Sequence, residues 1–133
     1  MANLSKAQEK LLNRIKEVTS KEKLNSEARG EDFDGWISSA DLSSKEFGWN
    51  RINIRTVIAL GKSGLVSVRI FREKSEYNGK LCIEISYEFK VMENGTIEHW
   101  SDMYSAARNT SSVNYIRSEI CFGKRFSVYR HSI

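Results

Sequence analysis

The sequence predicts an α+β domain, and two periodic patterns support that fold class. Apolar residues recur every three to four positions near the N-terminus, which is typical of an amphipathic helix. Between Leu81 and Val91, six apolar residues alternate with polar ones, which is typical of a half-buried strand. A chain of 133 residues is long enough for one sizeable core, so we expect a single domain over residues 1–133.

The first helix is expected from about Ser5 to Lys21. Ser5 and Gln8 have the spacing of a capping box, in which each side chain bonds to the main chain of the other residue. Residues 24–35 are polar and acidic and contain two glycines, so they are expected to form a loop. A minimal strand at Trp36–Ile37 follows this loop.

Two further helices are expected on either side of a glycine corner. A second capping-box candidate at Ser38 indicates a short helix that ends near Lys45. Gly48 lies between two aromatic residues and can adopt the positive φ that they would resist. The third helix is expected over Asn50–Leu60, with Asn50 as its N-cap and Gly61 just past its end.

The second half of the chain is expected to contain a long β-hairpin. Two alternating runs within Val66–Val91 are separated by the turn dipeptide Asn78-Gly79. A short strand at Thr96–Trp100 follows, then a short helix over residues 101–108. The spacing of Val113, Ile116 and Ile120 indicates another helix over residues 112–119, and residues 121–129 are expected to form a terminal hairpin.

Composition and charge are those of a globular protein with a basic bias. The formal net charge is +4, but residues 50–80 alone carry +5 and residues 105–133 carry +4. Localised positive charge suits a polyanionic partner. No apolar run is long enough for a membrane span, and the N-terminus lacks a secretory signal, so we expect a cytoplasmic protein with no membrane contact. Cys82 and Cys121 are expected to be reduced thiols, and neither has metal-ligand spacing.

The order of these elements resembles the winged helix-turn-helix of bacterial and phage regulators. The stretch WISSADLSSKEFGWNRINIRTVIALGKSGLV, residues 36–66, is similar to the pattern in which a glycine corner joins two helices and leads into a hairpin. The resemblance covers about residues 5–92 and identifies no single family. It implies a winged helix-turn-helix core of three helices plus a β-hairpin wing, followed by a C-terminal α/β extension over residues 93–133.

This resemblance implies a small transcriptional regulator that binds double-stranded DNA. The helix at residues 50–60 would enter the major groove, and the hairpin at residues 66–91 would lie along phosphates. Solvated surface charge and local ion pairing are the alternative explanation for these side chains. The expected DNA-binding residues are Asn50, Arg51, Asn53, Arg55, Thr56, Lys62, Arg69, Arg72, Lys74 and Lys80.

A protein-interaction module is the alternative function, for example a phage or plasmid inhibitor that binds a host protein through the same scaffold. A second copy of the chain is a further expected partner. We expect no catalysis, no cofactor and no metal site. Glu88-Phe89-Lys90 matches half of a metal-dependent nuclease motif, but an alternating strand produces this spacing by chance.

Overall fold

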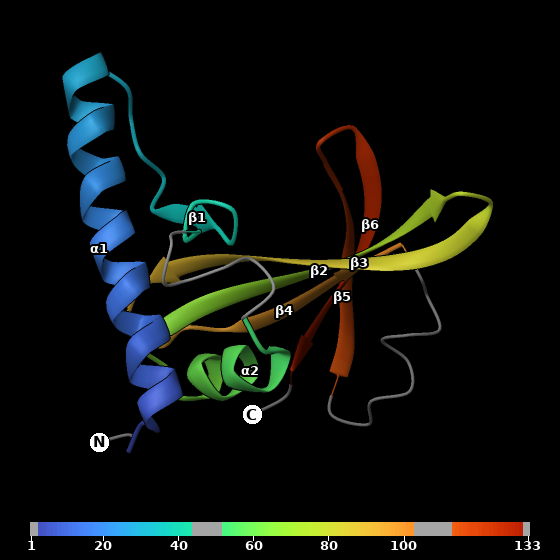
Figure 1. The fold of residues 1–133 in the computed structure, drawn as a ribbon, viewed down its shortest axis with the longest axis horizontal. Coiled ribbons are helices and arrows are strands. Elements are labelled where there is room, and N and C mark those ends of the chain that lie inside the picture. Colours follow the sequence, from blue (N-terminus) through green and yellow to red (C-terminus); the bar gives the residue numbers. More distant parts are fainter. Residues whose placement is uncertain (1–2, 44–51, 103–112, 132–133) are drawn as a thin grey trace. The chain divides into compact units, whose positions relative to one another are not determined.

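The architecture comes from a computed structural model that describes residues 3–43, 52–102 and 113–131. Within these residues the chain forms two helices and six strands, and the strands make one sheet in the order β1-β3-β2-β4-β6-β5 (Figure 1). The elements are α1 (Lys6–Arg29), β1 (Trp36–Ser38), α2 (Ile54–Lys62), β2 (Val66–Tyr77), β3 (Lys80–Val91), β4 (Ile97–Ser101), β5 (Val113–Cys121) and β6 (Lys124–His131).

The predicted winged helix-turn-helix fold is wrong. The described residues are dominated by a six-stranded sheet and do not form three helices with a wing. The hairpin at Val66–Val91 is confirmed, because β2 and β3 join through Asn78-Gly79 with positive φ at both turn residues. However, β2 and β3 lie in the middle of the strand order, whereas a wing would lie beside a helical core.

The C-terminal part of the chain is a β-hairpin where a helix was expected. Residues 113–121 form β5, which pairs antiparallel with β6. A β-bulge shifts the register between Tyr115 and Arg117. The extra residue at Ile116 changes the phase of the alternation in mid-strand, so the apolar residues take on a helix-like spacing. The helix predicted at residues 112–119 is therefore wrong. In its described part, the predicted α/β extension over residues 93–133 consists of the three strands β4, β5 and β6.

The chain divides into two compact units, and the strands β2 and β3 each contribute residues to both units. One unit comprises Met1–Val68 and Glu88–Thr96, and the other comprises Arg69–Tyr87 and Ile97–Ile133. We refer to them as unit 1 and unit 2. Each unit has its own buried side chains, and each is described by itself below.

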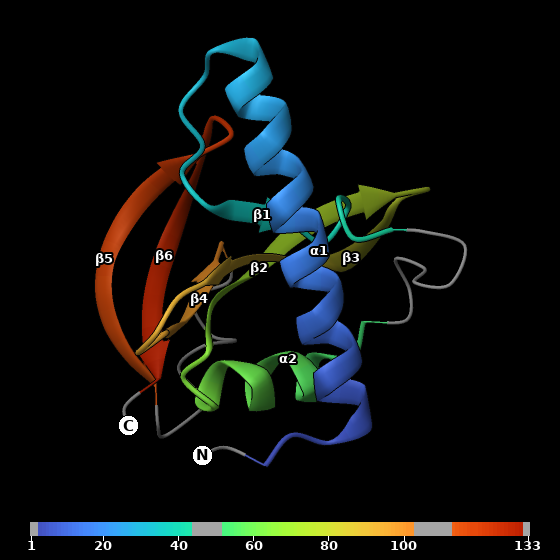
Figure 2. The same ribbon diagram turned by 90° about the vertical axis from the view of Figure 1, so that its left-hand side faces the viewer.

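In unit 1, α1 packs against β1 and α2 (Figure 2). The predicted capping box at Ser5 and Gln8 is confirmed, but the helix continues past the expected end to Arg29 and stops at Gly30, whose φ is 68°. The expected loop at residues 24–35 therefore begins only after Arg29, because residues 22–29 are mostly good helix formers. The buried apolar side chains of α1 are Leu11, Leu12, Ile15 and Val18.

The structure differs most from the prediction at the two helices expected around the glycine corner. Ser38 and Asp41 do form the reciprocal capping bonds, yet the following residues make successive i to i+3 turns through Ser43 and no helix. The corner and the expected cap Asn50 lie within residues 44–51, outside the described residues. The third helix is α2, which is capped by Asn53 and runs through Gly61.

The loop between β3 and β4 crosses the start of β2 at close range. Gly95 donates its N–H to the carbonyl of Gly64, and a Cβ at Gly95 would lie 2.3 Å from the carbonyl oxygen of Val66. Only glycine fits such an approach. The crossing places β4 beside β2 in a parallel sense, because Val68 bonds to Thr96 and Arg72 bonds to Asp102.

Unit 2 has an aromatic core on one face of its strands. Phe71, Trp100, Phe126 and Val128 form a buried cluster, and Cys121 packs against it. The ring centroids of Phe71 lie 5.1 Å from Trp100 and 5.5 Å from Phe126, distances at which aromatic pairs attract. The cluster holds β2, β4 and β6 against one another, and these are three of the four strands that carry the candidate site.

Candidate anion-binding site

The candidate site of unit 2 is centred on a buried carboxylate, Glu98, in the middle of β4. Its side chain is only 8% exposed. The indole nitrogen of Trp100 donates to Glu98 Oε1 at 3.2 Å. Both residues lie on the face of the sheet that carries the aromatic core, because residues two apart on a strand share a face. A carboxylate so deep in a protein needs positive partners.

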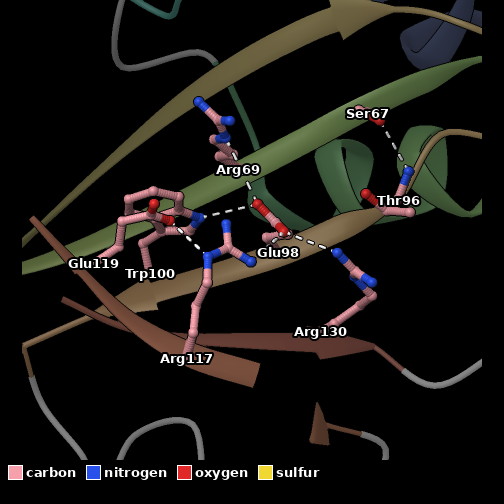
Figure 3. A network of polar contacts seen from close by, with 8 residues as sticks. All are labelled: Ser67, Arg69, Thr96, Glu98, Trp100, Arg117, Glu119 and Arg130. Atoms are coloured by element: carbon pink, nitrogen blue, oxygen red, sulfur yellow. Dashed lines mark hydrogen bonds and ion pairs between the residues drawn. The ribbon is translucent and has the colours of Figure 1, made fainter. Parts of the chain in front are cut away.

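Three arginines from three different strands surround Glu98 (Figure 3). Arg69 on β2 places Nε 3.6 Å from Oε1, and Arg117 on β5 places a terminal nitrogen 3.6 Å from Oε2. Arg130 on β6 donates to Oε2 at 3.2 Å. We call Arg69, Arg117 and Arg130 the arginine cluster. The cluster exists only because β2, β4, β6 and β5 lie side by side in this order.

Two further contacts hold the guanidinium groups in place. The guanidinium carbons of Arg69 and Arg117 lie 5.2 and 5.9 Å from the centroid of the Trp100 ring, within the range of cation–π attraction. Arg117 Nε also donates to Glu119 at 2.6 Å. This hydrogen bond to Glu119, together with the nearby carboxylate of Glu98, raises the pKa of Arg117.

The arginine cluster carries more positive charge and more donors than its carboxylates use. Three guanidinium groups against Glu98 and Glu119 leave one positive charge. Each guanidinium has five N–H donors, whereas a carboxylate accepts about four hydrogen bonds. The side chains of Arg117 and Arg130 are 37% and 47% exposed, so they can reach an anion in solvent. Fixed guanidinium groups of this kind suit carboxylate and phosphate ligands.

The residues predicted on the recognition helix do not join this cluster. Asn53 uses its side chain to cap α2 by accepting from the N–H of Arg55 at 2.8 Å. Arg55 and Lys62 are exposed on α2 in unit 1, and Thr56 is partly exposed there. Asn50 and Arg51 lie outside the described residues.

The residues predicted on the hairpin separate onto the two faces of unit 2. Arg69 belongs to the arginine cluster. Arg72 lies on the opposite face, where a terminal nitrogen lies 2.7 Å from Nδ1 of His99, and burial lowers the pKa of its guanidinium. Lys74 and Lys80 are exposed near the hairpin turn. The structure therefore brings one of the predicted residues into the site.

Sequence reasoning missed Glu98, Trp100, Arg117 and Arg130. These residues are far apart in the sequence and stand in no motif. The excess of positive charge over residues 105–133 was the signal that could have directed attention to Arg117 and Arg130. A single acidic residue between Ile97 and Trp100, within the predicted strand at Thr96–Trp100, was a second signal, because a buried carboxylate requires cationic partners.

The described residues offer neither a metal site nor a membrane-spanning helix. Residues 3–43, 52–102 and 113–131 contain no group of three or more His, Cys, Asp or Glu side chains that could hold a metal ion. Over the same ranges, neither helix has the length and apolar character needed to traverse a bilayer. Comparison with protein-family models, with curated proteins and with solved structures finds no match.

Proposed function

We propose that the protein binds double-stranded DNA through phosphate contacts made by the arginine cluster, and that it does so without catalysis. The observation that carries this proposal is that three strands direct arginines toward one buried carboxylate. Glu98 holds the guanidinium groups from the inner side, so an outer anion meets donors that are already in position. Preorganised donors lose less side-chain entropy on binding.

A duplex backbone suits the site better than a single strand does. Proteins that bind single strands stack the bases on exposed aromatic side chains. Trp100 is only 4% exposed and lies beneath the guanidinium groups of Arg69 and Arg117. The site therefore offers charge and hydrogen bonds but no stacking surface. Phosphate contacts of this type confer affinity with little sequence preference.

A fluorescence anisotropy titration with a labelled mixed-sequence duplex tests the proposal. We expect Arg117→Ala combined with Arg130→Ala to lower affinity by about tenfold or more at low salt, because each residue neutralises a phosphate. The slope of log K against log salt should become shallower by about 1.8, or about 0.9 for each lost contact.

Arg125→Ala is the matched control. Arg125 is exposed on the same strand as Arg130, but it points to the opposite face because its position differs by an odd number of residues. It removes one positive charge, as each substitution of the double variant does, and should leave the affinity almost unchanged. Equal losses in the control and in the double variant would refute a defined site, and so would salt-independent binding in the unmodified protein.

The protein-interaction alternative rests on a different observation. Apolar side chains in unit 2 are strongly exposed, including Leu81 at 68% and Phe122 at 80%. Exposed apolar surface often marks a protein contact. On this alternative a host protein would co-purify from native cells, and the duplex titration would give no binding curve at moderate salt.

A further inference from the structure

The outer edge of β3 in unit 2 is open to another strand. β3 lies between β1 and β2 in the sheet, but β1 pairs only with Glu88, Phe89 and Lys90. Over residues 80–87, no strand of the described chain therefore pairs with the outer edge of β3. Proteins usually protect such an edge because its unpaired N–H and C=O groups are a template for further strands.

The geometry of the hairpin identifies which groups point outward. The two-residue turn Asn78-Gly79 has φ values of 51° and 75°, as a type I′ turn requires, so Tyr77 and Lys80 face each other directly. Lys80 and every second residue after it then direct their main-chain groups toward β2. Leu81, Ile83 and Ile85 direct theirs toward the open edge, in phase with Phe89, which pairs with Ile37 of β1.

The side chains of the same three residues form an apolar stripe. Leu81 is 68% exposed, Ile83 is 49% exposed and Ile85 is 39% exposed, and all three lie on one face of β3. On the other face, Lys80, Cys82 and Glu84 are also exposed. This strand thus offers main-chain groups, apolar side chains and two opposite charges at a single edge.

We propose that residues 80–84 of β3 pair antiparallel with the same residues of a second copy, about a two-fold axis at Cys82. In this register Lys80 of each copy lies opposite Glu84 of the other. Leu81 lies opposite Ile83, and Cys82 lies opposite its own counterpart. This interface is independent of the arginine cluster and goes beyond the proposed DNA binding.

Charge complementarity selects this register over its neighbours. Opposed residues in an antiparallel pair must lie on the same face, so the axis must pass through a residue of the strand. An axis at Ile83 would place Glu84 against Cys82 and leave Lys80 without a carboxylate. An axis at Glu84 would oppose two carboxylates. Opposite charges directly across a strand pair stabilise it, whereas like charges destabilise it.

Cys82 provides a direct reporter of the register. It is a free, exposed thiol, and its main-chain groups point toward β2, so it would occupy a non-hydrogen-bonded position in the dimer. Cα atoms at such positions lie about 4.5 Å apart, within the range that a disulfide spans. With diamide as oxidant, two thiols lose two protons and two electrons, a disulfide forms, and the diazene becomes a hydrazine.

Charge reversal and light scattering test the interface. We expect the unmodified protein to form a dimer with a dissociation constant of about 100 µM or lower, an affinity appropriate to a small interface. Lys80→Glu or Glu84→Lys alone should weaken the dimer by about tenfold, because each change creates two like-charge contacts. The combination of both changes restores opposite charges and should restore the dimer. Glu27→Lys on α1 changes the net charge by the same amount as Glu84→Lys and should have no effect on the dimer.

The variant that combines Lys80→Glu and Glu84→Lys also tests whether the single changes act only within one chain. Glu84 contributes to the electrostatic environment of Lys124, so Glu84→Lys alone changes a charge interaction within the chain. The combined variant still lacks that charge interaction, yet it should dimerise. Circular dichroism verifies that each variant is folded, which we expect because both residues are exposed on the hairpin.

Four results would overturn the proposal. The first is a monomer at every concentration. The second is failure of the combined variant to recover the dimer. The third is a Cys121→Ser protein that diamide does not cross-link through Cys82. The fourth is a species that grows beyond a dimer with concentration, which would indicate that β3 pairs with a different edge of the next copy in an open-ended assembly.

Discussion

Two arginines on β2, three residues apart, show how differently the two faces of unit 2 accommodate the same side chain. Arg69 lies beside the carboxylate of Glu98 and over the ring of Trp100. Arg72 lies beside the imidazole of His99, and burial lowers the pKa of its guanidinium. On one face the guanidinium group lies beside a carboxylate. On the other face it lies beside a neutral hydrogen-bond acceptor.

The neutral acceptor has a definite protonation state. Arg72 can only donate, so Nδ1 of His99 accepts and its proton resides on Nε2. Nε2 then donates to Nδ1 of His131 at 3.0 Å. Burial, together with the charge of Arg72 and the neighbouring His131, lowers the pKa of His99 to about 3. The comparison shows that a basic residue type in a sequence does not reveal whether its charge is available to a ligand.

Glu98→Gln should remove the ion pairs between Glu98 and the arginine cluster and should have the largest effect on stability. It leaves three guanidinium groups around a neutral amide. We expect the free energy of unfolding to fall by about 2–3 kcal/mol, less than for a fully buried pair because the arginines are partly exposed. Denaturant titration measures the change. Glu76→Gln, which alters an exposed carboxylate on β2, should change it little, and a Glu98 variant as stable as the parent would refute the central role of this carboxylate.

Acidification should destabilise the folded protein through the buried imidazole of His99 on the opposite face. The pKa of His99 is about 3 in the folded chain, against an ordinary value of 6.5, so the unfolded state binds the proton first as pH falls. Stability from this group is therefore complete above pH 6.5 and declines below it. Between pH 6.5 and 5 we expect a loss of about 2 kcal/mol, or about 1.4 kcal/mol per pH unit.

Denaturant titrations at several pH values test this dependence. His99→Gln keeps a polar side chain that can accept from Arg72 but does not titrate. Its unfolding free energy should vary less between pH 6.5 and 5 than that of the unmodified protein. Identical pH profiles for the two proteins would contradict a neutral, buried His99.

Replacing each arginine in turn should give the smallest and most specific effect. Arg72→Met removes a positive charge next to His99, so the pKa of His99 should rise, while burial keeps it below 6.5. Arg69→Met removes the same charge from the other face and should leave that pKa unchanged. NMR titration of the imidazole signals distinguishes the two variants. A similar rise in both would mean that the faces are not electrically separate.

Local sequence signals predicted individual elements well and their assembly poorly. The capping box at Ser5, the turn at Asn78-Gly79 and the alternating strand before Val91 are all present, because each depends on neighbouring residues alone. The strand at residues 113–121 was mistaken for a helix because a bulge near Ile116 hides its period of two. The candidate site was largely missed because its charged members come from four strands.

The sequence by itself determined the start of the first helix, the turn of the β2–β3 hairpin and the alternation of β3, and that positive charge gathers in two stretches. It also determined that Lys80 and Glu84 lie on one strand with opposite charges. The close approach of Gly95 to β2 comes from the tertiary structure. Only the tertiary structure decided that Arg69, Arg117 and Arg130 share one carboxylate and that Arg72 does not. The reason is that strand order is set by the burial of whole faces against one another, an energy that is distributed over the entire sheet and has no local sequence signature.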